Sequence, residues 1–237
     1  MEWKALIFDV DGTLAETEEG HRQAFNQAFA EWGLGWHWDE PLYKKLLETT
    51  GGKERIRAFQ QQRPAEEQLS DDRIGALHRR KTELYAEILS SGGLSLRPGV
   101  EALMAEGRLQ GAKLAIATTT SLPNVEALCQ CIWGRRASDV FDVIAAGDQV
   151  SRKKPAPDIY LLALDRLGLP ASECIAFEDS EAGLQSALAA GLTVCVAPAR
   201  YTIDQDFAGA VSVTDTLEHG LQALTGGQSR PPTCKQS

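Results

Sequence analysis

Short apolar runs alternate with amphipathic segments along most of the chain, and this alternation predicts its secondary structure. Runs such as Ala5-Leu6-Ile7-Phe8 are typical of buried strands, whereas apolar residues three and four positions apart predict a helix with one buried face. The predicted strands are residues 5–8, 113–117, 143–146, 174–177, 193–196 and 210–213. The helices expected among them are residues 98–110, 125–133, 157–167, 181–190 and a last one that ends near Leu224. Strands that alternate with helices favour an α/β fold whose parallel sheet carries helices on both faces.

Residues 16–91 break this alternation, because only helical patterns are visible between the first strand and the second. The helices expected there are residues 16–32, 42–47, 54–62 and 74–89. The small and flexible Ser90-Ser91-Gly92-Gly93 marks the boundary after them. We therefore predict a Rossmann-like α/β core made of residues 1–15 and 92–225, with an all-helical cap inserted at 16–91. Residues 226–237 show no core-forming pattern and are expected to be disordered.

Composition narrows the class of protein without naming a function. The 237 residues are 43% hydrophobic and 24% charged, as in an ordinary soluble globular protein. The formal net charge of -9 argues against a nucleic-acid binder, although a local cluster of Lys and Arg would still suit an anionic small molecule. The five cysteines are irregularly spaced and include no usual zinc pair, so we expect reduced thiols. We see no signal peptide and no membrane span, and expect a cytoplasmic monomer.

The first chemical signal is Asp9-Val10-Asp11-Gly12-Thr13-Leu14, which directly follows the first predicted strand. Ligands of open α/β sheets bind at the carboxyl ends of strands, and Gly12 lets the backbone turn sharply there. Two carboxylates two residues apart point to the same side of a continuous strand, and they repel each other unless a cation or a proton intervenes. A hard cation such as Mg2+ is the usual solution. A solvated Asp-Gly turn is the plainer alternative for these six residues alone.

Three further polar segments stand where predicted strands end or helices begin. Thr118-Thr119-Thr120-Ser121 offers hydroxyl and backbone N–H groups before a helix, which suits an anion. Lys153-Lys154-Pro155 carries a Lys that could neutralise both a carboxylate and a phosphate oxygen. Glu178-Asp179-Ser180 adds a second carboxylate pair, and with Asp9 and Asp11 it supplies the oxygens that Mg2+ prefers. Each segment alone could be a helix cap or a solvated loop.

Together these residue types suit phosphoryl transfer. An ionised Asp can attack phosphorus and form an aspartyl-phosphate, and a second carboxyl can protonate the leaving alkoxide. A metal ion, a Lys and N–H donors would surround the negative charge of the transferred group.

The ordered set Asp9-x-Asp11-Gly12-Thr13, Thr118, Lys154 and Glu178-Asp179 resembles the four-motif signature of the haloacid dehalogenase superfamily. The resemblance covers the chain except its tail, and the insertion lies where that superfamily carries a helical cap. It implies that Asp9 is the nucleophile and Asp11 the general acid and base. It implies that Thr118 and Lys154 hold the transferred phosphoryl group. Mg2+ would be held by the Asp9 side chain, the Asp11 carbonyl and Asp179, with Glu178 beside it.

A closer likeness joins the segments 9–18, 21–26, 50–56 and 117–124, which resemble the CbbY proteins. These are sugar-bisphosphate phosphatases of the carbon-fixation setting, and they hydrolyse xylulose 1,5-bisphosphate, an inhibitor of Rubisco. The resemblance therefore implies a small-molecule sugar bisphosphate as substrate, Mg2+ as cofactor and a place beside the Calvin cycle.

The residue types of the predicted cap suit a substrate with two phosphates. Lys53 and Arg55 follow two glycines, so cations and backbone N–H groups can gather round a second, distal phosphate. His78 and Lys81 share a face of a predicted helix, which His21 could join, and we expect Glu16 to orient a sugar hydroxyl. Solvated charges of a lid are the plainer interpretation of each. The expected substrate-binding residues are Glu16, His21, Thr50, Gly51, Gly52, Lys53, Arg55, His78, Lys81, Thr118, Thr119, Thr120 and Lys154.

Four competing functions remain open on the sequence. A haloacid dehalogenase would need neither Mg2+ nor the second Asp, so Asp11 argues against it. A β-phosphoglucomutase-like enzyme has a similar core and cap, and a phosphoglycolate phosphatase is a further enzymic option. A non-catalytic phosphosugar sensor could share the fold, but it has no use for Asp11 as an acid.

Overall fold

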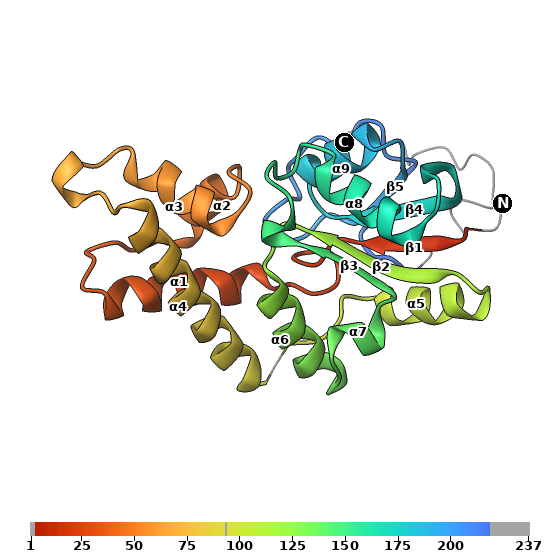
Figure 1. Cartoon of the computed structure of the whole chain (residues 1–237), viewed down its shortest axis with the longest axis horizontal. Helices are drawn as coiled ribbons and strands as arrows, with labels where there is room; N and C mark the ends of the chain where they lie inside the picture. The colour runs from red at the N-terminus through yellow and green to blue at the C-terminus, as the bar shows by residue number, and fades with distance from the viewer. Residues whose placement is uncertain (1–2, 93, 219–237) are drawn as a thin grey trace, which may run out of the picture.

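A six-stranded parallel sheet forms the centre of the computed structural model, which describes residues 3–92 and 94–218 (Figure 1). Its order is β3-β2-β1-β4-β5-β6, and every pair of neighbours is parallel. The strands are β1 (Ala5–Phe8), β2 (Lys113–Thr118), β3 (Val143–Ala146), β4 (Cys174–Glu178), β5 (Thr193–Val196) and β6 (Ser212–Val213). The predicted α/β class with a parallel sheet is therefore confirmed.

Helices cover both faces of the sheet, as the strand–helix alternation predicts. Figure 1 shows α5, α6 and α7 below the sheet and α8 and α9 above it. These helices are α5 (Val100–Leu109), α6 (Leu122–Trp133), α7 (Ala137–Val140), α8 (Asp158–Leu167) and α9 (Glu181–Ala189). Alternate residues of β1 serve the two faces: Leu6 and Phe8 pack with the lower helices, and Ile7 packs with the upper ones.

The strand order brings the polar motifs to one edge of the sheet. The chain leaves β1 and returns on either side of it, with β2 on one flank and β4 on the other. Phe8 lies opposite Ile116 of β2 and Phe177 of β4. The residues that follow these positions therefore emerge side by side, at the kind of crevice where open α/β sheets bind ligands.

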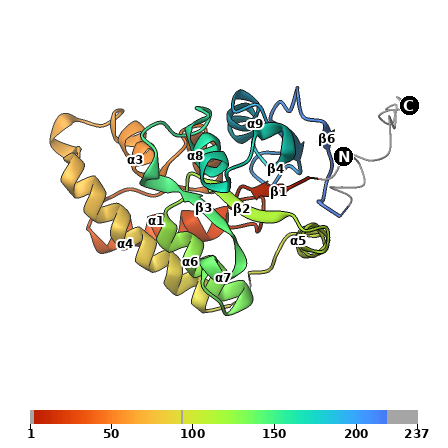
Figure 2. The same cartoon turned by 45° about the vertical axis from the view of Figure 1, so that its right-hand side comes forward.

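The described residues between Glu16 and Gly92 form helices and no strand. They are α1 (Glu18–Glu31), α2 (Glu40–Leu46), α3 (Gly52–Gln60), α4 (Asp71–Ser90) and a short 3-10 turn at Ala65–Glu67. Helix α1 packs along α4, and α4 also packs on α6 of the sheet layer (Figure 2). An aromatic cluster fills this block, made of Phe25, Phe29, Trp36, Trp38, Tyr43 and Phe59.

The boundaries differ from the sequence prediction in a few places. Helix α6 begins at Leu122 rather than at 125, because Pro123 fits the first turn of a helix. The short helix α7 and the 3-10 turns at Gly147–Gln149 and Ala171–Glu173 were not expected, since they are too short to show a period. The predicted helix ending near Leu224 and the tail 226–237 lie outside the described residues. Among the helices described, none has the length and apolar character needed to cross a membrane.

We predict that Phe29→Ala lowers the free energy of unfolding by about 3–5 kcal/mol, because it empties the centre of the aromatic cluster. Phe29 is fully buried and contacts Phe25, Trp36 and Trp38. Urea denaturation measures this change. The control is Leu109→Ala, whose side chain is 89% exposed and should change stability by less than about 0.5 kcal/mol. Similar losses in both variants would contradict the assignment of this cluster as the core of the helical block.

Candidate active site

A buried ion-pair network stands at the carboxyl ends of β1 and β4. Lys154, from the loop before α8, donates to Asp9 Oδ1 at 2.5 Å and to Glu178 Oε1 at 2.7 Å. Tyr160 of α8 also donates its hydroxyl to Glu178 Oε1. All of these side chains are nearly inaccessible to solvent. A buried charge needs such partners, because desolvation otherwise costs several kcal/mol per ion.

The network leaves negative charge uncompensated. One carboxylate oxygen from each of Asp9, Glu178 and Asp179 lies within 4.8 Å of the others, and all three residues are buried. Glu178 Oε2 is buried and has no hydrogen-bond partner in the described structure. An orphaned buried oxygen beside two further carboxylates is what a hard, oxygen-ligated cation would satisfy, so these residues fit Mg2+.

The pKa values of the residues in this cluster are shifted in directions that reflect the same excess of negative charge. Burial raises the pKa of Asp9 from 3.8 to about 8; Lys154 opposes the shift, whereas repulsion by Glu178 adds to it. Burial and the neighbouring Asp9 and Glu178 charges raise the pKa of Asp179 well above its usual range. Burial alone would lower the pKa of Lys154, but Asp9 and Glu178 raise it instead. A cation bound among the carboxylates would bring their pKa values back down.

Asp11 has a different environment, built mostly by the cap. Thr17 donates to Asp11 Oδ1 at 2.6 Å, and His21 Nε2 lies 3.0 Å from the same oxygen. Lys81 of α4 lies 2.7 Å from the other ring nitrogen of His21. The His21 ring stacks on Tyr85 with 3.8 Å between ring centroids. The general acid expected from the sequence is therefore oriented by side chains of α1 and α4.

This chain of contacts sets the proton positions. Burial and the Lys81 charge lower the pKa of His21, so its imidazole is neutral near pH 7. Burial also lowers the pKa of Lys81, to about 7. With Lys81 charged, it donates to His21 Nδ1, and the Nε2–H then donates to Asp11. Burial would raise the pKa of Asp11, but His21, Thr17 and Lys81 together lower it to about 2.

The threonine segment follows β2 and lines the same cavity as the carboxylates. Thr118 ends β2 and is buried, and its Oγ1 accepts from the Thr120 N–H at 3.2 Å. Asn124, in the first turns of α6, donates to Thr120 Oγ1 at 2.9 Å. These hydroxyls and the start of α6 form a donor-rich wall beside the carboxylates, as a transferred phosphoryl group requires.

One cavity of about 340 Å³ joins these groups to the cap. Of the residues that we predict from the sequence, its lining includes Asp9, Asp11, His21, Thr50, Gly51, Gly52, Lys53, Arg55, His78, Lys81, Thr118, Thr119, Thr120, Lys154 and Asp179. Glu178 is fully buried behind this lining. The cavity volume is within the range of small-molecule sites.

Glu16 is not brought to this cavity. Its carboxylate lies 3.4 Å from Arg97 Nε, and its side chain is 46% exposed. Residues 10–14 make a single tight turn, in which the Leu14 N–H donates to the Val10 carbonyl, and Asp11 and Ala15 form an isolated parallel bridge just before Glu16. Glu18 lines the cavity instead, and its carboxylate accepts from the Tyr43 hydroxyl at 2.7 Å.

The cap side of the cavity carries basic side chains, and some of them already form ion pairs or hydrogen bonds with other residues of the protein. Gly51 has a φ of 91°, and the His78 ring packs so closely on Gly52 that a side chain there would overlap it. Lys53 pairs with Asp148 of the sheet layer at 2.7 Å, and the Thr50 hydroxyl donates to the Lys154 carbonyl. Arg55 is buried and donates to the Leu46 carbonyl and the Tyr43 hydroxyl, both at 3.1 Å.

Several residues that complete the site had no signal in the sequence. Thr17 and Tyr160 act only through the side chains that they orient, so they carry no motif of their own. Arg97 donates to the carbonyls of Gly12, Ala197 and Pro198, and thereby ties the first motif to the loop after β5. Gly183 of α9 packs on Glu178 so closely that any side chain would overlap its carboxylate.

Comparison with known proteins gives consistent matches. A sequence model of the haloacid dehalogenase-like hydrolases matches residues 3–191. Protein CbbY of Rhodobacter capsulatus is 55% identical over 210 residues, which are 89% of this chain and 92% of that protein. The crystal structure of CbbY from Rhodobacter sphaeroides in complex with phosphate has a TM-score of 0.90 at 50% identity, and covers 94% of this chain and 99% of that one.

A mutant of that crystallised protein, in complex with xylulose-(1,5)bisphosphate, also has a TM-score of 0.90, at 49% identity and the same coverage of 94% and 99%. The family match spans most of the sheet layer and the whole helical block. The chain therefore belongs to the haloacid dehalogenase-like hydrolases, among the phosphatases of the CbbY type.

Proposed function

We propose that this phosphatase is Mg2+-dependent and hydrolyses xylulose 1,5-bisphosphate to xylulose 5-phosphate and phosphate through an aspartyl-phosphate. The observation that carries the proposal is the buried carboxylate cluster with its orphaned Glu178 oxygen, which opens through Asp9 and Asp179 into the cavity under the cap. The choice of substrate is supported by the similar CbbY structure that holds this bisphosphate.

Asp9, Asp179 and the Asp11 carbonyl would hold the metal, with Glu178 beside them. When bound, Mg2+ supplies positive charge that offsets the repulsion among the carboxylates and the charge on the phosphate. Lys154 holds Asp9 by one oxygen, so the carboxylate is fixed in orientation before the substrate arrives. Fixing a nucleophile in this way removes part of the entropy cost of the reaction.

In the first step the Asp9 carboxylate attacks phosphorus. The bond between phosphorus and the sugar oxygen breaks as the bond to Asp9 forms, and Asp11 gives a proton to the departing oxygen. Thr118 and Lys154 stabilise the oxygens of the transferred group. Asp11 is ionised in the free site, and the approach of a phosphate dianion raises its pKa, so it takes up the proton it later donates.

In the second step water attacks the aspartyl-phosphate. Asp11 is now the base and takes a proton from the water, the bond from phosphorus to Asp9 breaks, and inorganic phosphate leaves. His21 and Lys81 keep the Asp11 side chain in the same place for both proton transfers. A single oriented carboxyl group therefore serves both steps.

The second phosphate of the substrate would reach the cap. Gly51 and Gly52 expose backbone N–H groups at the start of α3, and Lys53 stands next to them. In the described structure Lys53 is paired with the exposed Asp148 at this seam between α3 and the sheet layer, and this anionic partner supports the placement of a distal phosphate beside Lys53. A phosphate dianion would compete with Asp148 for the same ammonium group.

We predict that Asp9→Asn abolishes turnover, because an amide cannot form the acyl-phosphate. Asp11→Asn should lower kcat on the order of 10^2–10^4-fold, through the loss of acid and base help. Steady-state release of phosphate from xylulose 1,5-bisphosphate measures both. Wild-type rates in either variant would mean that the nucleophile and the acid are misassigned.

We predict that exhaustive chelation removes the activity and that added Mg2+ restores it. Gly183→Ala should raise the Mg2+ concentration needed for half-maximal activity by about 10–100-fold, because the new methyl group displaces the Glu178 carboxylate. Glycine is not required there for the backbone, so the helix itself tolerates alanine. An unchanged Mg2+ requirement would remove Glu178 from the metal site.

We predict that Lys53→Met lowers kcat/KM for xylulose 1,5-bisphosphate by roughly 10–100-fold, since one charge-assisted contact is worth about 1.5–3 kcal/mol. Hydrolysis of a small phosphate monoester should barely change. The matched control is Lys44→Met, which also removes an ion pair between the cap and the sheet layer, to Asp204 at 2.6 Å, but lies outside the cavity. Equal losses on both substrates would show that Lys53 serves packing of the cap rather than the distal phosphate.

A further inference from the structure

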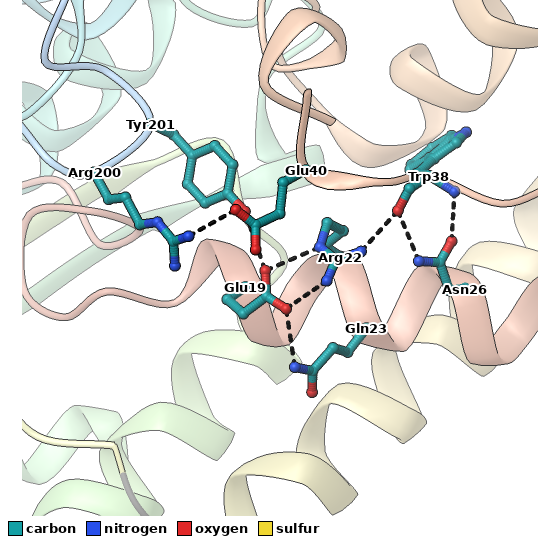
Figure 3. Close-up of polar contacts among 8 residues, drawn as sticks. All are labelled: Glu19, Arg22, Gln23, Asn26, Trp38, Glu40, Arg200 and Tyr201. Atoms are coloured by element: carbon teal, nitrogen blue, oxygen red, sulfur yellow. Dashed lines mark hydrogen bonds and ion pairs between the residues drawn. The ribbon is translucent and has the colours of Figure 1, made fainter. Parts of the chain in front are cut away.

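The loop that follows β5 contacts both the carboxylate cluster and the cap. Tyr201 and Thr202 are neighbours in this loop, and both are buried. The Thr202 hydroxyl donates to the metal-site candidate Asp179. The Tyr201 side chain points to α1, as Figure 3 shows. Two adjacent residues therefore join two parts of the molecule that the reaction needs together.

On the inner side, Thr202 holds Asp179. Its hydroxyl donates to Asp179 Oδ2 at 3.1 Å and accepts from the Ala199 N–H at 2.9 Å. The same carboxylate packs so closely on Gly12 that a side chain there would overlap it. A hydroxyl that donates to a metal-binding carboxylate fixes its rotamer, and loss of such a contact weakens metal binding.

On the cap side, the Tyr201 hydroxyl donates to Glu19 Oε2 at 3.1 Å. Glu19 does not move freely, because Arg22 donates to both of its oxygens, at 2.9 and 2.6 Å. Arg22 in turn donates to the Trp38 carbonyl at 2.9 Å, and Trp38 is held by Asn26 (Figure 3). The acceptor of the Tyr201 hydroxyl is therefore a fixed part of the cap.

Two further ion pairs join this loop to the cap, Arg200 with Glu40 and Lys44 with Asp204, and both are more exposed than the Tyr201 contact. Arg200 pairs with Glu40 at 2.6 Å, but both side chains are about half exposed, and exposed ion pairs contribute little. The start of the loop is anchored from below, where Arg97 donates to the Ala197 carbonyl at 2.6 Å and to the Pro198 carbonyl at 2.8 Å. Tyr201 lies between this anchor and Thr202. Its buried side chain contacts α1 through Glu19, so its position depends on the position of α1.

We propose that Tyr201 and Thr202 are positioning residues that couple the seating of α1 to the orientation of Asp179, so that the docked cap strengthens divalent-cation binding. The inference rests on the metal site of the proposed function. Coupling is reciprocal, so a bound cation also favours the docked cap by the same factor.

The test is direct Mn2+ binding to the full-length protein without substrate, followed by electron paramagnetic resonance. Thr202→Val should weaken Mn2+ binding by about 10–100-fold, and Thr202→Ser, which keeps the hydroxyl, should restore it. Tyr201→Phe should weaken it about fivefold, although its hydroxyl contacts no carboxylate of the cluster. Lys44→Met is the control: its partner Asp204 lies in the same loop, but both side chains are exposed, 44% and 76%, so this ion pair contributes little and Mn2+ affinity should stay unchanged.

A second readout separates positioning from folding. In Tyr201→Phe, kcat at saturating Mg2+ should return to the wild-type value, whereas a folding defect would not respond to Mg2+. Wild-type Mn2+ affinity in Tyr201→Phe, or the same loss in Lys44→Met, would overturn the coupling while leaving the phosphatase proposal intact. Absence of Mn2+ binding in the wild-type protein would overturn both, because the metal site itself would then be wrong.

Discussion

Repulsion among carboxylates that are buried together, away from water, is the constraint on which the rest of this structure depends. Asp9, Glu178 and Asp179 lie within reach of one cation, and burial weakens the screening of their repulsion. Lys154 offsets part of it through two short contacts. The remaining charge favours a hard cation, and a phosphoryl group brought to the same place would meet positive charge from Lys154 and from such a cation. In the proposed function, metal binding and chemistry would thus share one electrostatic origin.

The sheet makes such a cluster possible. Asp9 and Glu178 are far apart in sequence, yet β1 and β4 are neighbours in a register that aligns Phe8 with Phe177. The backbone N–H of Asp9 also donates to the Phe177 carbonyl at 3.0 Å, which extends the ladder up to Asp9 itself. Carboxylates mounted on the last rung of a packed sheet cannot separate to relieve their repulsion, so the repulsion remains available for binding a cation.

The sequence predicts the fold well because its strands are short apolar runs and its helices have one apolar face. It also leads us to expect carboxylates gathered at neighbouring strand ends, and the structure places Asp9, Glu178 and Asp179 close together there. Glu16, which the sequence led us to expect beside a sugar hydroxyl, lies instead near Arg97 and does not line the cavity. Contacts such as Thr202 with Asp179, or Lys53 with Asp148, join residues that have no shared motif. Only the tertiary structure brings these partners together, so periodicity and local motifs carry no trace of them.

Asp9 and Asp11 are two residues apart but have opposite environments. The difference shows that the cap does more than enclose the cavity, because its side chains also set the environment of Asp11. Burial raises the pKa of Asp9 to about 8, whereas His21 and Thr17, against the effect of burial, bring that of Asp11 to about 2. The sheet layer supplies the partners of Asp9, and α1 and α4 supply those of Asp11 beyond Thr17. A displaced cap would therefore leave Asp9 with its partners but release Asp11 from His21. If Asp11 is the acid and base of the proposed reaction, proton transfer would depend on the docked cap, and both proposed steps would require the cavity to be closed around a substrate.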